Sequence, residues 1–389
     1  FLDSAAQQHP DAHYSFLTAD PVAIVRSKGS LTETREAPTG TWKAVTGDAL
    51  TRARELLPRE PVPAVPGIPP FQGGLAGYVG YDWGAVLERL PRPRYDDLLV
   101  PDVILALYDW VIAWDHRENT AWLISTGLPA TGPEAERRAR ERITQIRERL
   151  RRRPPGATND APGRRIADLG PVETTAPAYP VTGVEGAETI GLQSTFTRRG
   201  YLDAVARVRE YIVAGDIFQA NLSQRFQAGL EESPFELYRR LRRRNPAPFA
   251  AYLEYGDLQV LSASPERFLR LDGERGIETR PIKGTRPRGL GPMHDAALGR
   301  ALAESEKDRA ENVMIVDLLR NDLSRVCRPG SVRVPELFAL EHHPTVHHLV
   351  STVVGELEPT ADAVDLIRAA FPGGSITGAP KVRAMEIIA

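Results

Sequence analysis

The sequence contains a single cysteine, Cys327, and no long apolar run. One cysteine cannot form a disulfide bond within the chain, or a zinc site with the usual Cys/His spacing. No stretch reaches the roughly 18 apolar residues that a membrane-spanning helix needs, and no charged segment followed by an apolar one indicates a secretory signal. We therefore expect a cytoplasmic protein that has no membrane partner.

Neither sign of charge is in excess, because Lys+Arg number 49 and Asp+Glu number 51. A formal net charge of −2 gives no reason to expect nucleic acid or an anionic membrane as a partner. Residues 133–153 are predicted to form a helix rich in arginine. Glutamates are interleaved with these arginines and aromatic residues are absent, so a solvated helix face is expected rather than a nucleic-acid contact.

The chain has 389 residues, 42% of them hydrophobic, which is enough for one large domain or two. Residues 1–153 are predicted to form an N-terminal region, residues 154–194 a proline- and glycine-rich linker or surface excursion, and residues 195–389 a second domain. Helices and strands alternate without a strict strand–helix–strand rhythm, so the predicted class is α+β. The chain starts at Phe1 and stops at Ala389 inside an unfinished helical pattern, so we expect a fragment truncated at the C-terminus.

Several elements of the second half have local sequence signals. A helix over residues 199–214 is expected to end at Gly215, because glycine readily adopts the left-handed cap conformation. Another helix is expected over residues 306–325, because Ser305 and Asp308 have the spacing of a capping box. The remaining elements predicted here are a strand over residues 216–226, a hairpin of residues 249–255 and 258–263, and strands within residues 331–357.

A glycine-rich segment, Gly373 to Gly378, has the glycine spacing of a phosphate-binding loop. The residues that follow are Ala379-Pro380-Lys381, which replace the Lys-Ser/Thr that would reach phosphate and magnesium. Nucleotide binding is therefore not expected. A glycine-rich loop that leads into a helix starting near Pro380 still favours an anion through its backbone amides.

Four charged residues, Glu304, Lys307, Asp308 and Glu311, recur at helical spacing. Spacing alone favours a surface ladder of ion pairs over a metal site, although a lone helix carboxylate is a plausible magnesium ligand. Lys283 lies in a turn-like stretch and by default would be exposed. It would need burial or a nearby cation to become a nucleophile.

Four histidines come in two adjacent pairs, His342-His343 and His347-His348. Neighbouring side chains on a strand point to opposite faces, so at most one member of each pair faces a given site.

Five stretches together resemble the chorismate-binding family, which includes component I of anthranilate synthase and of aminodeoxychorismate synthase. These stretches are residues 215–225, 264–268, 281–285, 307–323 and 371–388. Their order and spacing also match, strongly over residues 195–389 and more loosely over residues 1–125. The resemblance implies an anthranilate synthase component I-like α+β fold, in which two β-rich layers with outer helices enclose the chorismate site.

The residue between Pro-Ile and Gly-Thr, here Lys283, separates the reactions within this family. Anthranilate synthases usually carry alanine there, whereas aminodeoxychorismate synthases typically carry lysine. Water-using members carry a lysine base where this chain has Gln219, so ammonia is the nucleophile that the resemblance implies. The expected reaction converts chorismate and ammonia to 4-amino-4-deoxychorismate, for para-aminobenzoate and folate biosynthesis. The alternatives are anthranilate synthase component I and a non-catalytic fragment that binds only a partner or ligand.

The resemblance also implies the roles of individual residues. Lys283 attacks the chorismate ring and displaces the C4 hydroxyl, Glu266 is the general acid for that hydroxyl, and His348 is the active-site histidine. Thr285 and Gly374 line the substrate pocket.

The cofactor that the resemblance implies is Mg²⁺, with Glu311 as one ligand. In the family a second carboxylate ligand, and further substrate-binding residues, come from a part of the chain beyond Ala389. Ammonia is expected from a glutamine amidotransferase, as a separate subunit or a fused domain, because Cys327 lacks the Gly-x-Cys-x-Gly context of a glutaminase nucleophile.

Residues 1–4 and 245–249 resemble the two segments that hold feedback tryptophan in anthranilate synthases. The candidate pocket residues are Ser4, Pro248 and Phe249. Either an aromatic amino acid binds there, or the chain's own side chains fill the pocket.

Overall fold

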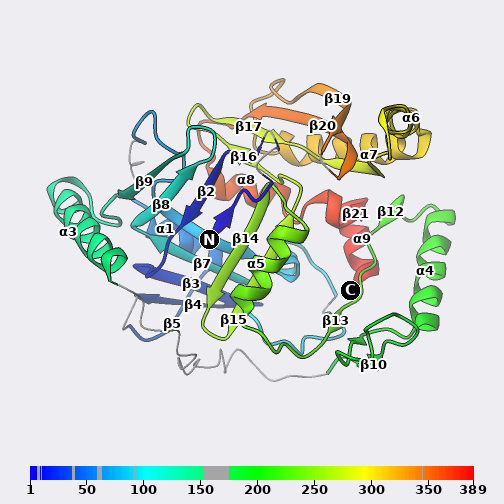
Figure 1. Cartoon of the computed structure of the whole chain (residues 1–389), viewed down its shortest axis with the longest axis horizontal. Helices are drawn as coiled ribbons and strands as arrows, with labels where there is room; N and C mark the ends of the chain where they lie inside the picture. The colour runs from blue at the N-terminus through cyan, green and yellow to red at the C-terminus, as the bar shows by residue number, and fades with distance from the viewer. Residues whose placement is uncertain are drawn as a thin grey trace. The chain divides into compact units, whose positions relative to one another are not determined.

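The computed structural model describes residues 1–6, 9, 11–36, 40–58, 64–91, 93–152, 175–343 and 345–389. They belong to two units, each assembled from segments that are far apart in the sequence (Figure 1). The first unit comprises Phe1–Val86, Leu98–Val172 and Glu232–Pro265, and the second comprises Leu87–Asp97, Glu173–Glu231 and Glu266–Ala389. The linker expected over residues 154–194 lies in part outside the described residues.

One sheet of the first unit joins the start of the chain to its middle. Its six strands follow the order β15-β14-β1-β2-β8-β9, and all neighbours are antiparallel. Figure 1 shows the green β14 beside the dark blue strands of the N-terminus. The strands are β1 (Leu2–Asp3), β2 (Tyr14–Leu17), β8 (Trp110–Asp115), β9 (Thr120–Ser125), β14 (Phe249–Tyr255) and β15 (Leu258–Ser264). The predicted hairpin of β14 and β15 is confirmed, and Gly256 in its turn has a φ of 69°.

The second sheet of the first unit has the order β5-β4-β3-β7-β6. Its strands are β3 (Ala23–Lys28), β4 (Leu31–Glu36), β5 (Lys43–Val45), β6 (Gly74–Val79) and β7 (Val103–Tyr108). Ile24, Ile104 and Tyr108 form part of its apolar core. A Cβ atom added at Gly77 would lie 1.9 Å from the carbonyl oxygen of Ile104, so only glycine lets β6 and β7 approach this closely.

The helices of this part of the chain are α1 (Ala49–Leu56), η1 (Tyr81–Trp83), α2 (Gly84–Leu87), α3 (Gly132–Arg151) and α5 (Pro234–Arg244). The arginine-rich helix predicted over residues 133–153 corresponds to α3, in which Ile146 is the buried residue. Its solvated face is therefore confirmed. None of the helices that the structure describes is long and apolar enough to cross a membrane.

The main sheet of the second unit is built around one long strand, β20 (Val346–Glu356). The strand order is β16-β17-β20-β18, and β19 also pairs with β20. The other strands are β16 (Arg270–Leu271), β17 (Gly276–Thr279), β18 (Ile282–Pro287) and β19 (Arg333–His342). Helices α6 (Pro292–Ala303), α7 (Glu306–Ser324) and α8 (Ala363–Ala370) complete this layer. Ile277, Val316, Val353 and Leu366 form its core, which ties β17 and β20 to α7 and α8.

The other elements described in the second unit are short strands, two α-helices and one 3-10 helix. These elements are β10 (Tyr179–Pro180), β11 (Gln193–Ser194), α4 (Arg198–Val213), β12 (Gln219–Ala220), β13 (Phe226–Gln227), η2 (Gly374–Ile376), β21 (Gly378–Ala379) and α9 (Lys381–Ile388). Strand β12 pairs with β21, and β11 pairs with both β10 and β13.

Local signals predicted the helix ends of the second unit well. Helix α4 is capped at Ala214, and Gly215 follows with a φ of 83°. Helix α7 begins after Ser305, whose hydroxyl accepts from the backbone amide of Asp308 at 3.3 Å. Glu304 is instead the cap of α6, so the prediction that it shares a helix face with Glu311 was wrong.

The continuous strand predicted over residues 216–226 was also wrong, because only Gln219–Ala220 pairs before β13 begins at Phe226. The amides on either side of Gln219–Ala220 bond to the same segment as β12 does: Phe218 N donates to Ala379 O and Asn221 N to Thr377 O, at 2.7 and 2.9 Å.

Candidate active site

A bulge in β18 carries the predicted nucleophile of the second unit. Ile282 pairs with Val350 and Thr285 with His348, so β18 has one residue more than β20 between these two pairs. Gly284 makes the bulge, with a φ of 88°, and a Cβ there would lie 2.8 Å from Leu302. Any other residue here would be strained by the positive φ and would clash with Leu302. Glycine is therefore needed, and the bulge that it makes sets the path of the strand next to Lys283.

The amine of Lys283 is held by a backbone carbonyl. Lys283 Nζ donates to the carbonyl oxygen of Ser375 at 3.0 Å, and Asn221 Nδ2 donates to the same oxygen at 2.9 Å. Ser375 lies in η2, in the glycine-rich segment that follows α8. Three stretches that are distant in the sequence thus meet at one oxygen atom.

The carboxyl group of Glu266 belongs to the same site, and both its burial and the charge of Lys283 act on its pKa. Burial raises its pKa, and the hydroxyl of Ser375, the charge of Lys283 and the backbone amide of Ile282 oppose that rise. A carboxyl group that keeps its proton to higher pH is suited to general-acid chemistry. The structure thus brings two of the predicted catalytic residues, Lys283 and Glu266, into one site.

Thr285 and His348 form a cross-strand pair on β18 and β20. Thr285 Oγ1 lies 3.0 Å from His348 Nδ1. The neighbouring His347 has no exposed surface, and its Nε2 lies 2.9 Å from Asp295 Oδ1 while its Nδ1 lies 2.7 Å from His342 Nδ1. The two histidines make separate contacts, as the alternation of the strand predicts.

Gly374 lies where η2 packs against α7. The residue is buried, and an added Cβ would lie 2.4 Å from Leu318 Cδ2. Within the same segment, Thr377 Oγ1 donates to the carbonyl oxygen of Gly373 at 2.8 Å. The absence of a side chain at Gly374 therefore sets how closely the segment that carries Ser375 approaches α7.

Glu311, on α7, is partly exposed and lies 3.7 Å from Lys307 Nζ. The predicted surface ladder is present for this pair, whereas Asp308 is buried and accepts instead from Arg286 at 2.8 Å. Magnesium is bound through one or two carboxylates and keeps several waters. A partly exposed carboxylate with only a loose ion pair fits such a ligand.

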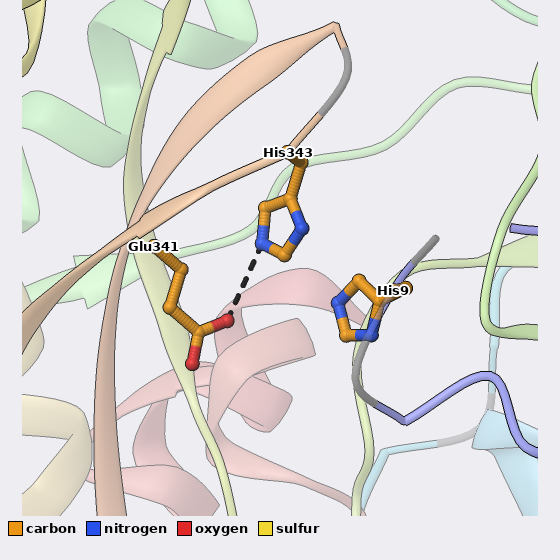
Figure 2. Close-up of side chains that lie close together, drawn as sticks. All are labelled: His9, Glu341 and His343. Carbon is orange, nitrogen blue, oxygen red and sulfur yellow. Dashed lines mark ion pairs between the residues drawn. The ribbon is translucent and has the colours of Figure 1, made fainter. Parts of the chain in front are cut away.

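A further pair of possible metal ligands lies at the end of β19. Figure 2 shows Glu341 and His343, whose Oε2 and Nε2 atoms are 3.3 Å apart. His9, also drawn there, belongs to the first unit. Two ligands within one unit are too few to define a metal centre, so we assign no metal to them.

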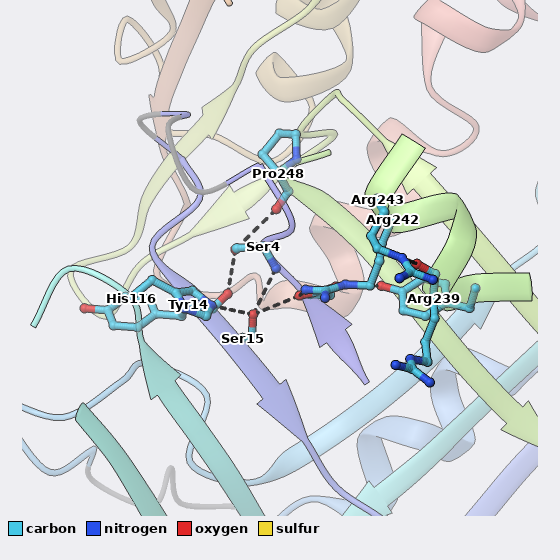
Figure 3. Close-up of polar contacts among 10 residues, drawn as sticks. Ser4, Tyr14, Ser15, His116, Arg239, Arg242, Arg243 and Pro248 are labelled. Carbon is cyan, nitrogen blue, oxygen red and sulfur yellow. Dashed lines mark hydrogen bonds and ion pairs between the residues drawn. The ribbon is translucent and has the colours of Figure 1, made fainter. Parts of the chain in front are cut away.

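The two segments expected to form an amino-acid pocket meet in the first unit. Ser4 Oγ donates to the carbonyl oxygen of Tyr14 at 2.6 Å and lies 3.4 Å from that of Pro248 (Figure 3). The amide of Ser4 donates to Ser15 Oγ at 3.0 Å. Phe249 is the first residue of β14, directly after Pro248.

Asp3, the residue before Ser4, is buried. Its carboxylate accepts from Arg242 Nε at 2.6 Å, from Tyr238 at 3.0 Å and from Ser15 at 3.2 Å. The chain's own side chains therefore use the polar groups of this region.

The contacts of Ser375 and Asn221 were not predicted from the sequence. Asn221 lies inside a stretch that carried the family resemblance, but its partner is 154 residues away. The Ser375 contact is made by a backbone oxygen, for which the side-chain sequence gives no signal.

Known proteins resemble this chain in sequence and in fold. A family profile described as chorismate binding enzyme matches residues 2–389. Component 1 of aminodeoxychorismate synthase from Salmonella typhimurium is 43% identical over all of this chain and 76% of the relative. Component 1 of anthranilate synthase from Streptomyces coelicolor is 40% identical over all of this chain and 69% of the relative.

The fold comparison gives the same result. The crystal structure of anthranilate synthase component I from Streptococcus pneumoniae superposes with a TM-score of 0.76 at 28% identity, covering 98% of this chain and 77% of the other. The predicted α+β fold of the anthranilate synthase component I type is thereby confirmed. Because the family profile spans almost every residue, this chain belongs to the family of chorismate-binding enzymes.

Proposed function

We propose that the chain is the ammonia-using component of an aminodeoxychorismate synthase, which converts chorismate to 4-amino-4-deoxychorismate for para-aminobenzoate and folate biosynthesis. Relatives named for this enzyme and for anthranilate synthase have similar identities to the chain, 43% and 40%, so overall identity alone does not choose between them. The observation that carries the proposal is the amine of Lys283, held 3.0 Å from Ser375 O in the same site as Glu266.

In the proposed first step, the Lys283 ammonium passes a proton to the Glu266 carboxylate, and the resulting neutral amine forms a bond to the chorismate ring as the C4–oxygen bond breaks. Glu266 gives its proton to the departing hydroxyl, which leaves as water. The new secondary ammonium then returns a proton to the Glu266 carboxylate. Burial raises the pKa of Glu266, which favours the protonated form that gives its proton to the departing hydroxyl.

In the proposed second step, ammonia replaces the lysine. A carbon–nitrogen bond to ammonia forms, the bond to Lys283 Nζ breaks, and a proton from the incoming nitrogen passes to the lysine amine. The carbonyl of Ser375 is a neutral acceptor, so it can hold the amine in place before and after the reaction without requiring it to be charged.

The remaining predicted residues are the metal ligand, the active-site histidine and two residues of the substrate pocket. Glu311 would hold Mg²⁺, which when bound would polarise the ring carboxylate. His348, oriented by its contact with Thr285, would be the third catalytic residue, and Thr285 and the closely packed Gly374 would line the substrate pocket.

Ammonia is proposed to come from a glutamine amidotransferase, either a partner subunit or a fused domain. The chain's one cysteine, Cys327, is 3% exposed, and burial raises the pKa of its thiol to about 11. A glutaminase nucleophile must instead be an accessible thiolate at neutral pH.

Mass spectrometry of the intact enzyme tests the covalent step. With magnesium and chorismate but no ammonia, the full-length wild type should gain the mass of chorismate minus water, and peptide mapping should locate the addition on Lys283. Lys283→Ala should show no addition. A wild type that forms product with ammonia but never shows the adduct would contradict the covalent role. Product analysis then separates the rival, because only anthranilate synthase would release fluorescent anthranilate.

For the region around Ser4, Pro248 and Phe249, we propose that the chain's own side chains fill the pocket. The carboxylate of Asp3 and the hydroxyl of Ser4 already have protein partners, so tryptophan would have to displace these bonds. We expect millimolar tryptophan to leave the thermal unfolding midpoint unchanged. A rise that Ser4→Ala abolishes would instead identify an aromatic amino-acid site.

A further inference from the structure

The glycine-rich segment from Gly373 to Gly378 is followed by Ala379-Pro380-Lys381, and the side chain of Lys381 is largely buried. Lys381 is the first residue of α9, and its side chain is 12% exposed. Its Nζ lies 2.6 Å from Asp322 Oδ2, and the Asp322 side chain is 4% exposed. The proposed reaction gives this buried ion pair no role.

The same ammonium group joins the two ends of the segment whose Ser375 carbonyl accepts from Lys283. Lys381 Nζ also donates to the carbonyl oxygen of Ala370, the last residue of α8, at 2.9 Å. Residues 371–380, which include η2 and β21, therefore form a loop whose start and end are tied together by one side chain. Asp322 lies near the C-terminal end of α7, so the tie also fastens this loop to α7.

The middle of this loop carries the carbonyl group that receives Lys283. Ser375 O accepts from Lys283 Nζ at 3.0 Å, and Gly374 is packed against Leu318 of α7. Any change in where the loop ends sit on α7 therefore moves the acceptor of the nucleophilic amine. A displacement of about 1 Å at a reacting group can cost about a hundredfold in rate.

From this geometry we propose that Lys381 and Asp322 form a clasp that positions the Ser375 carbonyl, and through it the amine of Lys283, for attack on the substrate. Lys381 and Asp322 are positioning residues, since neither reaches the reacting atoms. The inference rests on the proposed role of Lys283 as the nucleophile.

Burying the Lys381–Asp322 ion pair costs free energy that an apolar contact in the same place would not. Burial raises the pKa of Asp322 to about 6 and lowers that of Lys381, so the surroundings disfavour both charges. Replacing a buried ion pair by well-packed apolar residues is often neutral or stabilising. An apolar replacement of both residues can therefore keep the fold stable while it removes their positioning role, so an experiment can separate the two effects.

The decisive variant is the double replacement Asp322→Leu/Lys381→Met in the full-length enzyme. Lys381→Met alone leaves Asp322 buried without its partner and should lower both the thermal unfolding midpoint and turnover. In the double variant we expect the midpoint to recover, while formation of the Lys283 adduct stays about ten- to a hundredfold slower than in the wild type. The loss should appear in kcat, with KM for chorismate nearly unchanged.

A matched control lies in the first unit, where Lys28 Nζ is 2.9 Å from Asp102 Oδ1 and the two side chains are 12% and 8% exposed. Lys28→Met should lower the unfolding midpoint but leave the rate of adduct formation unchanged. A double variant of the clasp that recovers both stability and the wild-type adduct rate would overturn the positioning role.

The outcomes also separate this inference from the proposed function. If the wild type forms the adduct and the clasp double variant forms it equally fast, only the clasp is wrong. If the wild type turns over without any adduct on Lys283, the covalent proposal fails. In that case kcat of the stable double variant still decides, because a wild-type kcat would show that the clasp positions nothing that the reaction needs.

Discussion

At the scale of single residues, the site depends on groups whose surroundings change their chemistry. Lys283 and Glu266 were predicted as a pair from a family resemblance, and the structure adds the acceptor, Ser375 O, that holds the lysine. This acceptor could not be predicted, because it is a backbone oxygen 92 residues further along the chain.

The raised pKa of Glu266 predicts a pH dependence of stability. The fold favours the protonated form, so the stabilising contribution is complete below the pKa of the unfolded chain, about 4.3. It is lost as the pH rises through the higher folded-state pKa. In urea titrations, the unfolding free energy of the wild type relative to Glu266→Gln should therefore fall as the pH rises above about 4.3. A rise with pH would contradict the burial argument.

Glu311 and Lys307 allow the ligand role to be tested against the surface ion pair. Lys307 is 83% exposed, so breaking the pair should cost less than about 1 kcal/mol of unfolding free energy. Glu311→Gln is expected to abolish magnesium-dependent turnover, whereas Lys307→Ala should leave turnover intact. Steady-state rates over a magnesium titration measure both, and normal activity of Glu311→Gln at saturating magnesium would exclude the ligand role.

At the scale of secondary-structure elements, predictions succeeded where neighbouring residues set an element. They failed where the element depends on residues far away in the sequence. The end of α4 at Gly215 and the start of α7 at Ser305 are set by neighbouring residues, and both were predicted. The strand expected over residues 216–226 failed because its pairing partner is the two-residue β21, more than 150 residues away. The bulge at Gly284 was likewise not visible without the register of β20.

The packing of η2 against α7 gives a prediction at this scale. Gly374→Ala would place a Cβ 2.4 Å from Leu318 Cδ2, so overpacking should lower the unfolding free energy by about 1–3 kcal/mol and reduce turnover. Shortening the opposing side chain in Gly374→Ala/Leu318→Ala should recover part of the turnover. Gly229→Ala, which has no atom within 4 Å of the added Cβ, serves as the control. Equal activity of all three variants would show that this contact does not set the site.

At the scale of the whole molecule, the buried thiol of Cys327 gives a prediction about the source of the ammonia that the proposed reaction would use. We expect the purified full-length subunit to form 4-amino-4-deoxychorismate with ammonium salts but not with glutamine, because its one thiol, Cys327, is buried. Addition of the amidotransferase should confer glutamine-dependent turnover. Product formation from glutamine by the subunit alone would mean that the nucleophile has been misassigned, and Cys327→Ala would then show whether this thiol is responsible.

The pairing of β1 with β14 has a consequence for how the protein is made. Leu2 pairs with Ala251, so the six-stranded sheet of the first unit cannot be completed until the ribosome has synthesised most of the chain. At about 5–20 residues per second, the N-terminal strand waits roughly 10–50 s for its partner. During that time the edge of β1 that later pairs with β14 is open, and other chains can join it. Slowing translation before residue 249 should therefore increase aggregation of the nascent chain, more than slowing it after residue 264.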